Sequence, residues 1–191
     1  MADFAELLQT RRSIRDYQDR TVPKDLIRQV IKDSCLAPNA GNRQPWRFVV
    51  IHHRGIIQEI SEHCKANHVR EIEDNPISPL KQYEAALRSK TFNIFYNAPC
   101  LVYILGNIAV HSLYVDCALA ASYFMFSAAD RGLGTCWIGL GARIVDELLR
   151  ERIGIGTQER IVAPIIAGYP KRIPSPPSRR EADIIEIQDG S

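Results

Sequence analysis

Three arginines and a serine lie within residues 11 to 17, RRSIRDY, near the start of the chain. Guanidinium groups bind phosphate oxygens through paired hydrogen bonds, and a serine hydroxyl adds a neutral donor. The alternative is that these arginines follow a helix end and complement its dipole. A second basic cluster, Ser178 to Arg180, lies near the other end of the chain. It is either part of the same phosphate site or a solvated tail.

Two further segments are rich in amide groups or glycine. Residues 38 to 46, PNAGNRQPW, either present hydrogen-bonding groups to a planar heterocycle or form a structural turn. Residues 132 to 141, GLGTCWIGLG, contain four glycines. They miss the dinucleotide fingerprint, because the sixth position from Gly132 is Trp137. Their glycines either let the backbone approach something flat or make a tight turn.

Cysteine and histidine indicate neither a metal site nor thiol catalysis. The five cysteines include no CxxC pair, and their odd number is a poor disulfide framework, which fits a reducing, cytoplasmic setting. No base is recognisable beside Cys136, so we do not expect it to act as a nucleophile. Four histidines could hold a metal together with Cys64, but their spacing matches no compact metal-ligand motif, and we interpret the histidines as surface side chains: His52, His53, His63 and His68.

Charge and hydropathy argue against nucleic-acid and membrane proteins. The formal net charge is only +2, so a surface built throughout for nucleic acid is not expected, although a local basic patch stays open. The N-terminal MADFAELLQTRR has no apolar core and does not resemble a signal peptide. The most apolar helix candidate, residues 112–129, contains Asp116 and several serines, which predicts a buried helix rather than a membrane span.

The elements that position these segments mix helices and strands without strict βαβ alternation, which predicts an α+β domain. Apolar periodicity predicts helices over residues 3–12 (capped by Asp3), 23–37, 112–129 and 145–153. Apolar runs predict strands over residues 46–52, 100–106 and 160–168, the second of them central. The polar residues 53–97 predict one or two surface helices and irregular cover.

The C-terminal segment predicts an arm. Residues 169 to 180, YPKRIPSPPSRR, contain four prolines and must run extended, and ADIIEIQ after them predicts an edge strand over residues 182–188. Such an arm either wraps its own domain or reaches a second subunit, which is a common way to build a symmetric dimer. We expect one domain over residues 1–191, with a cover segment at 53–97 and an arm at 170–191 that reaches the partner subunit.

Taken in order, RRSIRDY, APNAGNRQPWRFVVI, DRGLGTCWIGLG and the C-terminal GYP…SRR resemble the nitroreductase family of flavin enzymes. The resemblance runs from about residue 8 to about residue 181, and residues 53–90 carry no match. It implies an α+β fold with a mostly antiparallel central sheet flanked by helices, in an intertwined homodimer with FMN at the subunit interface. It also implies ping-pong chemistry: NADH or NADPH reduces FMN, which then reduces a nitroaromatic, a quinone or a free flavin.

The resemblance further implies which residues bind the phosphate end of FMN. Arg11, Arg12 and Ser13 match the phosphate and ribityl binders. Arg179 and Arg180 fall where the family has a basic pair for the phosphate, with a spacing that leaves open which of the two binds.

Other positions match residues around the flavin ring. Arg15 matches the basic residue near N1 and O2, where positive charge stabilises the anionic reduced ring. The loop that the other subunit contributes in this family matches Pro38, Asn39, Ala40, Asn42 and Gln44. The segment beside the ring, where a backbone N–H commonly meets N5, matches Trp137, Ile138 and Gly139.

Several functional alternatives stay open at this stage. Within the same fold they are a reductive dehalogenase or a flavin-destroying oxygenase. Outside catalysis they are a flavin storage or sensor protein, and a nucleic-acid-binding module that uses the arginine clusters. The absence of a separate nicotinamide-binding half suits a cofactor that visits and leaves. The choice between NADH and NADPH, the physiological acceptor and any protein redox partner are also open.

Overall fold

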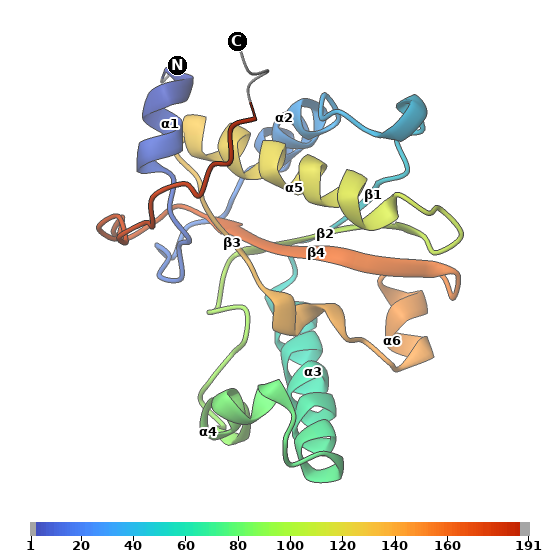
Figure 1. Ribbon diagram of the computed structural model, residues 1–191. Helices are drawn as coiled ribbons and strands as arrows, with labels where there is room; N and C mark the ends of the chain where they lie inside the picture. Colours follow the sequence, from blue (N-terminus) through green and yellow to red (C-terminus); the bar gives the residue numbers. More distant parts are fainter. Residues whose placement is uncertain (1–2, 188–191) are drawn as a thin grey trace.

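The structure is a computed structural model that describes residues 3 to 187 (Figure 1). Within these residues, four strands form one antiparallel sheet in the order β1-β2-β4-β3. The strands are β1 (Arg47–Ile51), β2 (Cys100–Asn107), β3 (Gly134–Trp137) and β4 (Glu159–Gly168). The helices are α1 (Phe4–Thr10), α2 (Lys24–Ser34), α3 (Arg54–Asp74), α4 (Glu84–Arg88), α5 (Leu113–Asp130) and α6 (Glu147–Arg152). Short 3₁₀ turns are η1 (Ala40–Asn42), η2 (Pro79–Tyr83) and η3 (Gly139–Ala142).

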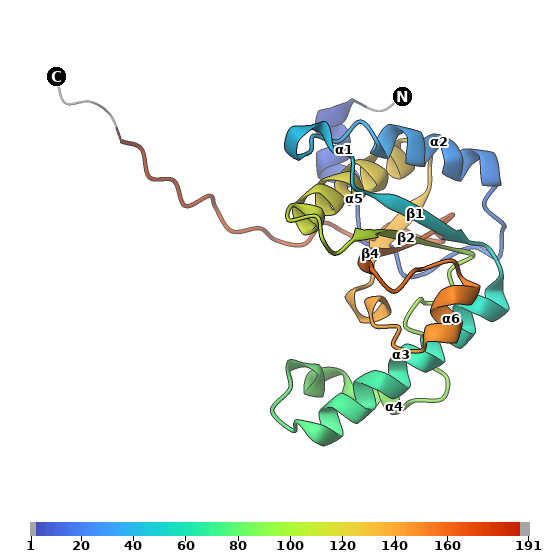
Figure 2. The same ribbon diagram turned by 90° about the vertical axis from the view of Figure 1, so that its right-hand side faces the viewer.

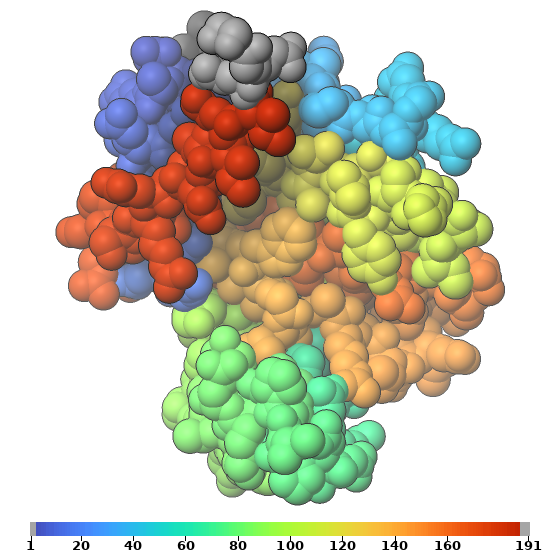
Figure 3. Space-filling model, in the orientation of Figure 1, coloured from blue at the N-terminus to red at the C-terminus, as the bar shows by residue number. Residues whose placement is uncertain are grey.

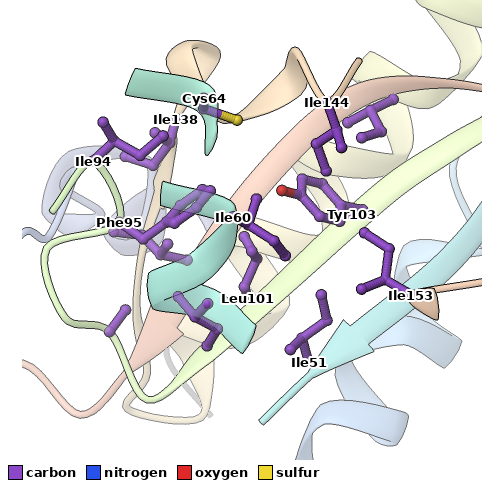
Figure 4. Close-up of a cluster of buried hydrophobic side chains, with 14 of the residues drawn as sticks. Ile51, Ile60, Cys64, Ile94, Phe95, Leu101, Tyr103, Ile138, Ile144 and Ile153 are labelled. Carbon is purple, nitrogen blue, oxygen red and sulfur yellow. The ribbon is translucent and has the colours of Figure 1, made fainter. Parts of the chain in front are cut away.

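Helices cover both faces of the sheet, α1, α2 and α5 on one and α3, α4 and α6 on the other (Figure 1). The continuous apolar run of β2 serves both faces. Leu101 and Tyr103 join the cluster beneath α3 (Figure 4), whereas Val102 and Ile104 join the cluster beneath α5. The prediction of a central strand is confirmed, because β2 lies between β1 and β4 with both faces buried.

The sequence did not predict β3, which falls inside GLGTCWIGLG. It is short and glycine-rich, yet it pairs with β4 from Gly134↔Gly168 to Trp137↔Ile165. Gly134 has a packing reason: a Cβ there would lie 2.6 to 2.9 Å from three side-chain atoms of Ile14. The glycine therefore permits the segment after α1 to lie against this strand.

α5 ends as the sequence predicts, near a glycine. Gly132 has a positive φ of 74°, and the Leu133 N–H donates to the carbonyl of Ala128. This left-handed residue closes the helix and turns the chain into β3. No helix in the described part of the chain is both long and apolar enough to cross a membrane.

Two terminal predictions need correction. Asp3 stands at the start of α1, but its side chain makes no capping hydrogen bond. The edge strand predicted over residues 182–188 is wrong for residues 182–187, which have no strand conformation, and residue 188 lies outside the described residues. The arm runs away from the body of the chain (Figure 2), so no neighbouring strand is present to pair with it.

Residues 53–97 form helices, as expected, but they are more than a polar surface layer. α3 buries Ile57, Ile60 and Ile72 in the hydrophobic cluster on this side of the sheet. Together with η2 and α4 it projects from the body below the sheet in Figure 1. The interpretation of the histidines here as surface side chains is wrong for His68, which is 5% exposed because it lies on the inward face of α3.

Candidate functional site

The RRSIR segment lies beside β3, so two motifs far apart in the sequence meet in space. Ser13 forms a parallel bridge with Thr135, and the Ile14 N–H donates to the Thr135 carbonyl over 2.9 Å. Tyr17 bridges Pro170, which brings the start of the C-terminal segment to the same place. Packing of Ile14 over Gly134 makes this contact close.

This contact leaves buried polar atoms without partners. Arg12 Nε and Thr135 Oγ1 are both buried and have no hydrogen-bond partner among the described residues. Both residues line a cavity of about 110 Å³, together with Arg11, Gly132 and Gly134. A buried donor without an acceptor costs about 1–3 kcal/mol, so such atoms point to a bound group. A guanidinium, a hydroxyl and nearby glycine backbone suit an anion such as a phosphate.

The positive charge of the segment is not neutralised by the chain itself. Within the described residues, no ion pair joins Arg11, Arg12 or Arg15 to a carboxylate. Two of these guanidinium groups lie near aromatic rings instead, Arg11 5.4 Å from the Phe126 centroid and Arg15 5.8 Å from the Tyr96 centroid. These contacts orient the arginines while leaving their N–H donors for a ligand.

Tyr96 and Asn97, which the sequence motifs do not mark, adopt unusual backbone angles at the site. Both have a φ of 53°, in the left-handed region that side chains rarely occupy. Tyr96 also packs edge-on against Phe92, with the ring centroids 5.8 Å apart. Strained residues are enriched at binding sites, and here the strain holds the ring beside Arg15.

The segment Trp137–Gly139 follows β3 directly and faces outward in part. Trp137 is 36% exposed, whereas Ile138 is buried and its N–H donates to the Pro164 carbonyl over 2.8 Å. Gly139 has no heavy atom within 4 Å of where a Cβ would be, so a flat group has room to approach its backbone. The Ile138 N–H is thus already used, and Gly139 begins a turn whose first N–H groups have no partner inside it.

A larger, open cavity of about 730 Å³ begins at Gly139 and extends between α5, α6 and β4. Its charged lining is mixed, with Arg143 and Arg160 alongside Glu147 and Glu159. The cavity provides space for a ligand next to the Trp137–Gly139 segment, and its lining carries charges of both signs.

Cys136 lies beneath the arginine segment and is not poised for nucleophilic attack. Its side chain is 2% exposed, and its thiol donates to the Trp137 carbonyl over 3.6 Å. Burial raises the pKa of the Cys136 thiol, and the nearby charge of Arg15 offsets only part of that effect. The thiol therefore stays protonated near neutral pH.

The PNAGNRQPW loop forms a rigid structure at a different end of α5. The Ala40 N–H donates to Asp116 Oδ1 over 3.1 Å, and the Gln44 N–H donates to Asn39 Oδ1 over 2.9 Å. The Gln44 amide also donates to Asn42 Oδ1. Gly41, Asn42 and Gln44 all have positive φ, so the loop is held in a strained form. Asp116, which the sequence analysis noted only as a charge in a helix, anchors it.

A single chain does not bring this loop to the arginine segment. The loop contacts α5 at Asp116, whereas Arg11 contacts α5 at Phe126. Ten residues of helix separate these contacts, or about 15 Å. Pro38, Asn39, Ala40, Asn42 and Gln44 therefore lie apart from Arg11 to Arg15.

The second basic cluster also lies apart from the first. Arg179 and Arg180 are exposed on the extended arm, which leaves the body in Figure 2. No described hydrogen bond or ion pair links either of them to Arg11 or Arg12. Their convergence on one phosphate stays a prediction.

The histidine group does not form a metal site. No cluster of three or more histidine, cysteine or acidic side chains with metal-binding geometry occurs among residues 3–187. Instead, His53 Nδ1 accepts the Ile56 N–H at the start of α3, and His68 Nε2 lies 2.8 Å from the Leu140 carbonyl.

Comparison with known proteins identifies relatives over nearly the whole chain. The family model described as "Nitroreductase family" matches residues 8–169. An Archaeoglobus fulgidus protein, whose name of NADH dehydrogenase/NAD(P)H nitroreductase is itself provisional, is 28% identical over 172 residues, or 90% of this chain and 87% of that protein. Mouse iodotyrosine deiodinase 1 is 26% identical over 97% of this chain and 68% of its own length.

The fold is likewise similar to that of solved structures. A nitroreductase from Bacteroides fragilis, solved with bound FMN, superposes with a TM-score of 0.84 at 20% identity. The superposition covers 98% of this chain and 100% of that one. At this identity the likeness concerns the fold.

Proposed function

The chain belongs to the nitroreductase family of flavin oxidoreductases, and on that premise we propose that it is an FMN-dependent enzyme that oxidises NADH or NADPH by a ping-pong mechanism. Its second substrates in this proposal are nitroaromatic, quinone or flavin-type acceptors. FMN would supply the redox chemistry when bound, as a two-electron carrier between the nicotinamide and the acceptor. The chain's own residues bind and orient, and none is needed as a dedicated acid or base.

The observation that carries this proposal is the pair of unpartnered buried atoms at the RRSIR–β3 contact. Arg12 Nε and Thr135 Oγ1 lack partners among the described residues, and both residues line a cavity that Arg11 also lines. Neither Arg11 nor Arg12 has a carboxylate counterion in the described part of the chain. A phosphate monoester such as that of FMN supplies acceptor oxygens and negative charge at this place. Arg15 then stabilises negative charge on the ring from its position beside Tyr96.

The separation of the two flavin-binding regions supports a homodimer. Because Asn39 and Ala40 lie about 15 Å along α5 from the arginine segment, a second copy is needed to bring such a loop to the same ligand. α5 and the segment around η3 reach the surface on one face (Figure 3), where Tyr114 and Val115 are more than half exposed. In this proposal that face forms the interface, and the arm reaches the partner.

Reductive dehalogenation is a second candidate, favoured by one observation. Iodotyrosine deiodinases are among the curated relatives that match almost the full chain. A halotyrosine therefore belongs in the acceptor panel beside a quinone and a nitroaromatic.

The proposal is tested by a visible absorption spectrum of the protein after FMN addition and desalting, repeated anaerobically with NADH and then NADPH. We expect retained flavin bands that bleach with at least one nucleotide and return with an acceptor. Flavin that is retained but never bleaches would indicate a storage or sensor role. Protein that retains no flavin would contradict the proposal.

A further inference from the structure

The turn that follows β3 is held from behind by α3. Six hydrogen bonds run along residues 140–146, five of them made by α3 side chains and one by Tyr103 on β2. His68 Nε2 lies 2.8 Å from the Leu140 carbonyl, and the Tyr103 hydroxyl donates to the Gly141 carbonyl over 3.1 Å. The Arg143 carbonyl accepts from Cys64 Sγ and from Asn67 Nδ2, each over 3.4 Å. Further on, His63 Nε2 accepts the N–H groups of Val145 and Asp146.

The surroundings of two of these side chains, His68 and Cys64, determine their protonation states. The Leu140 carbonyl is an acceptor, so His68 carries its proton on Nε2, and its Nδ1 is buried without a partner in the described residues. Burial lowers the pKa of His68, which keeps the ring neutral near pH 7. Burial also raises the pKa of Cys64 to about 12, so its thiol remains a donor. The hydrogen bonds that His68 and Cys64 donate are therefore kept near neutral pH.

The anchored turn is the one that carries the Gly139 backbone. Ile138 is held to Pro164 on one side of Gly139, and Leu140 is held to His68 on the other. Figure 4 shows Cys64 and Tyr103 in the same buried cluster as Ile138 and Ile144, between α3 and this segment. The open face of Gly139 is thus fixed by side chains that lie on the buried side of the turn.

We propose that His68 is a positioning residue for the flavin site: through the Leu140 carbonyl it fixes the backbone of Gly139 against the ring and so helps to set the flavin's reduction potential. The inference rests on the proposed function. It gives α3, which none of the four motifs in the sequence analysis covers, a role in the chemistry. Backbone donors stabilise an electron-rich ring more than its oxidised form, so a loosened turn lowers the potential.

The test compares His68→Leu with His68→Gln, because glutamine Nε2 can replace the imidazole donor and leucine cannot. We expect His68→Leu to lower the FMN midpoint potential by about 30 mV, a tenfold change for a two-electron couple. We expect His68→Gln to restore most of the difference. The matched control is His53→Leu, which removes a histidine cap from the far end of the same helix and should leave the potential unchanged.

The outcomes separate this inference from the proposed function. Wild-type protein that retains no FMN contradicts the proposed function itself. Wild-type protein that retains FMN, with a His68→Leu potential that is unchanged or raised, overturns the positioning role alone. If His68→Leu does not fold, His68→Met provides the same comparison, since methionine also cannot donate a hydrogen bond to the Leu140 carbonyl.

Discussion

Arginine side chains dominate the chemistry of this chain, and their surroundings give each a different role. Arg12 has a buried Nε without a partner, Arg11 lies by Phe126, and Arg15 lies by Tyr96. Arg28, by contrast, forms an exposed ion pair with Asp25 on α2. Buried donors without a partner are rare, so the surroundings of Arg12 distinguish it from an ordinary surface arginine such as Arg28.

Arg12→Ala should weaken FMN binding roughly 10- to 100-fold. Charged hydrogen bonds contribute about 1.5–3 kcal/mol, and this substitution removes the Arg12 guanidinium from the residues that line the cavity. Titration of flavin fluorescence measures the effect, with Arg28→Ala as the control that leaves affinity unchanged. Equal affinities for the two variants would rule out Arg12 as a phosphate ligand.

Arg15→Ala should lower the flavin's reduction potential by about 30 mV or more, since it removes a charge that favours the reduced anion. Arg15→Lys keeps the charge and should largely preserve the potential. Equilibration with a reference dye gives the value. A potential that does not respond to Arg15→Ala would place this residue away from the ring.

His68 should contribute to the pH dependence of stability. Burial lowers its pKa in the folded state below the ordinary 6.5, so the unfolded chain binds the proton more readily. The contribution of His68 to the free energy of unfolding should therefore be complete above about pH 6.5. It should decline as the pH falls below that value, by at most about 1.4 kcal/mol per pH unit. Urea unfolding between about pH 5 and about pH 8 measures this.

His68→Gln should flatten part of that decline. His52 contributes in the same direction, because burial and Lys24 lower its pKa too. The contribution of His68 is therefore obtained from the difference between the unfolding free energies of wild type and variant at each pH. Parallel curves would show that His68 does not titrate differently in the two states.

Helices and strands place these side chains through a few close contacts. One of them is the close approach of Ile14 to Gly134, which allows the chain after α1 to run beside β3. A second is the buried carboxylate of Asp116, which accepts from Ser112 and Ala40 and so fixes the PNAGNRQPW loop on α5. Each contact joins elements far apart in the sequence.

Gly134→Ala should destabilise the protein by about 1–3 kcal/mol and weaken FMN binding, because the new Cβ would displace Ile14 and the arginines beyond it. Gly139→Ala is the matched control for stability: its Cβ meets no atom within 4 Å, so unfolding should change by less than about 0.5 kcal/mol. Denaturant unfolding curves compare them. A Gly134→Ala protein with wild-type stability and affinity would show that this approach is not limiting.

The C-terminal arm extends from the body of the molecule and leaves apolar side chains in solvent. Ile184, Ile185 and Ile187 are each at least 70% exposed on that arm (Figure 2). Exposed apolar groups in such numbers mark an interaction surface. They agree with the proposed homodimer, in which a partner covers them.

Truncation before Pro174 should therefore abolish dimerisation while leaving the monomer folded, since residues 174–187 pack on no described element of their own chain. Sedimentation velocity reports the assembly state, and circular dichroism reports folding. An intact, flavin-loaded dimer of the truncated protein would show that the arm is dispensable.

Local patterns in the sequence were sufficient to predict most helices, the strands β1, β2 and β4, and the order of the motifs. Helical periodicity and continuous apolar runs are properties of neighbouring residues, so they can be recognised from the sequence alone. The α+β class followed from the same patterns. The family followed from motifs that keep their order and spacing.

Other features depended on contacts between distant residues, which no local pattern encodes. β3 exists because β4 and Ile14 flank it, and its glycines concealed it. His68 is buried and His63 is half-buried, and both form hydrogen bonds with the segment after β3 because the η3 turn packs against α3. The predicted C-terminal strand is absent because strand formation needs a partner, and the chain places none beside residues 182–187. Periodicity determined the elements, and tertiary contact decided which of them meet.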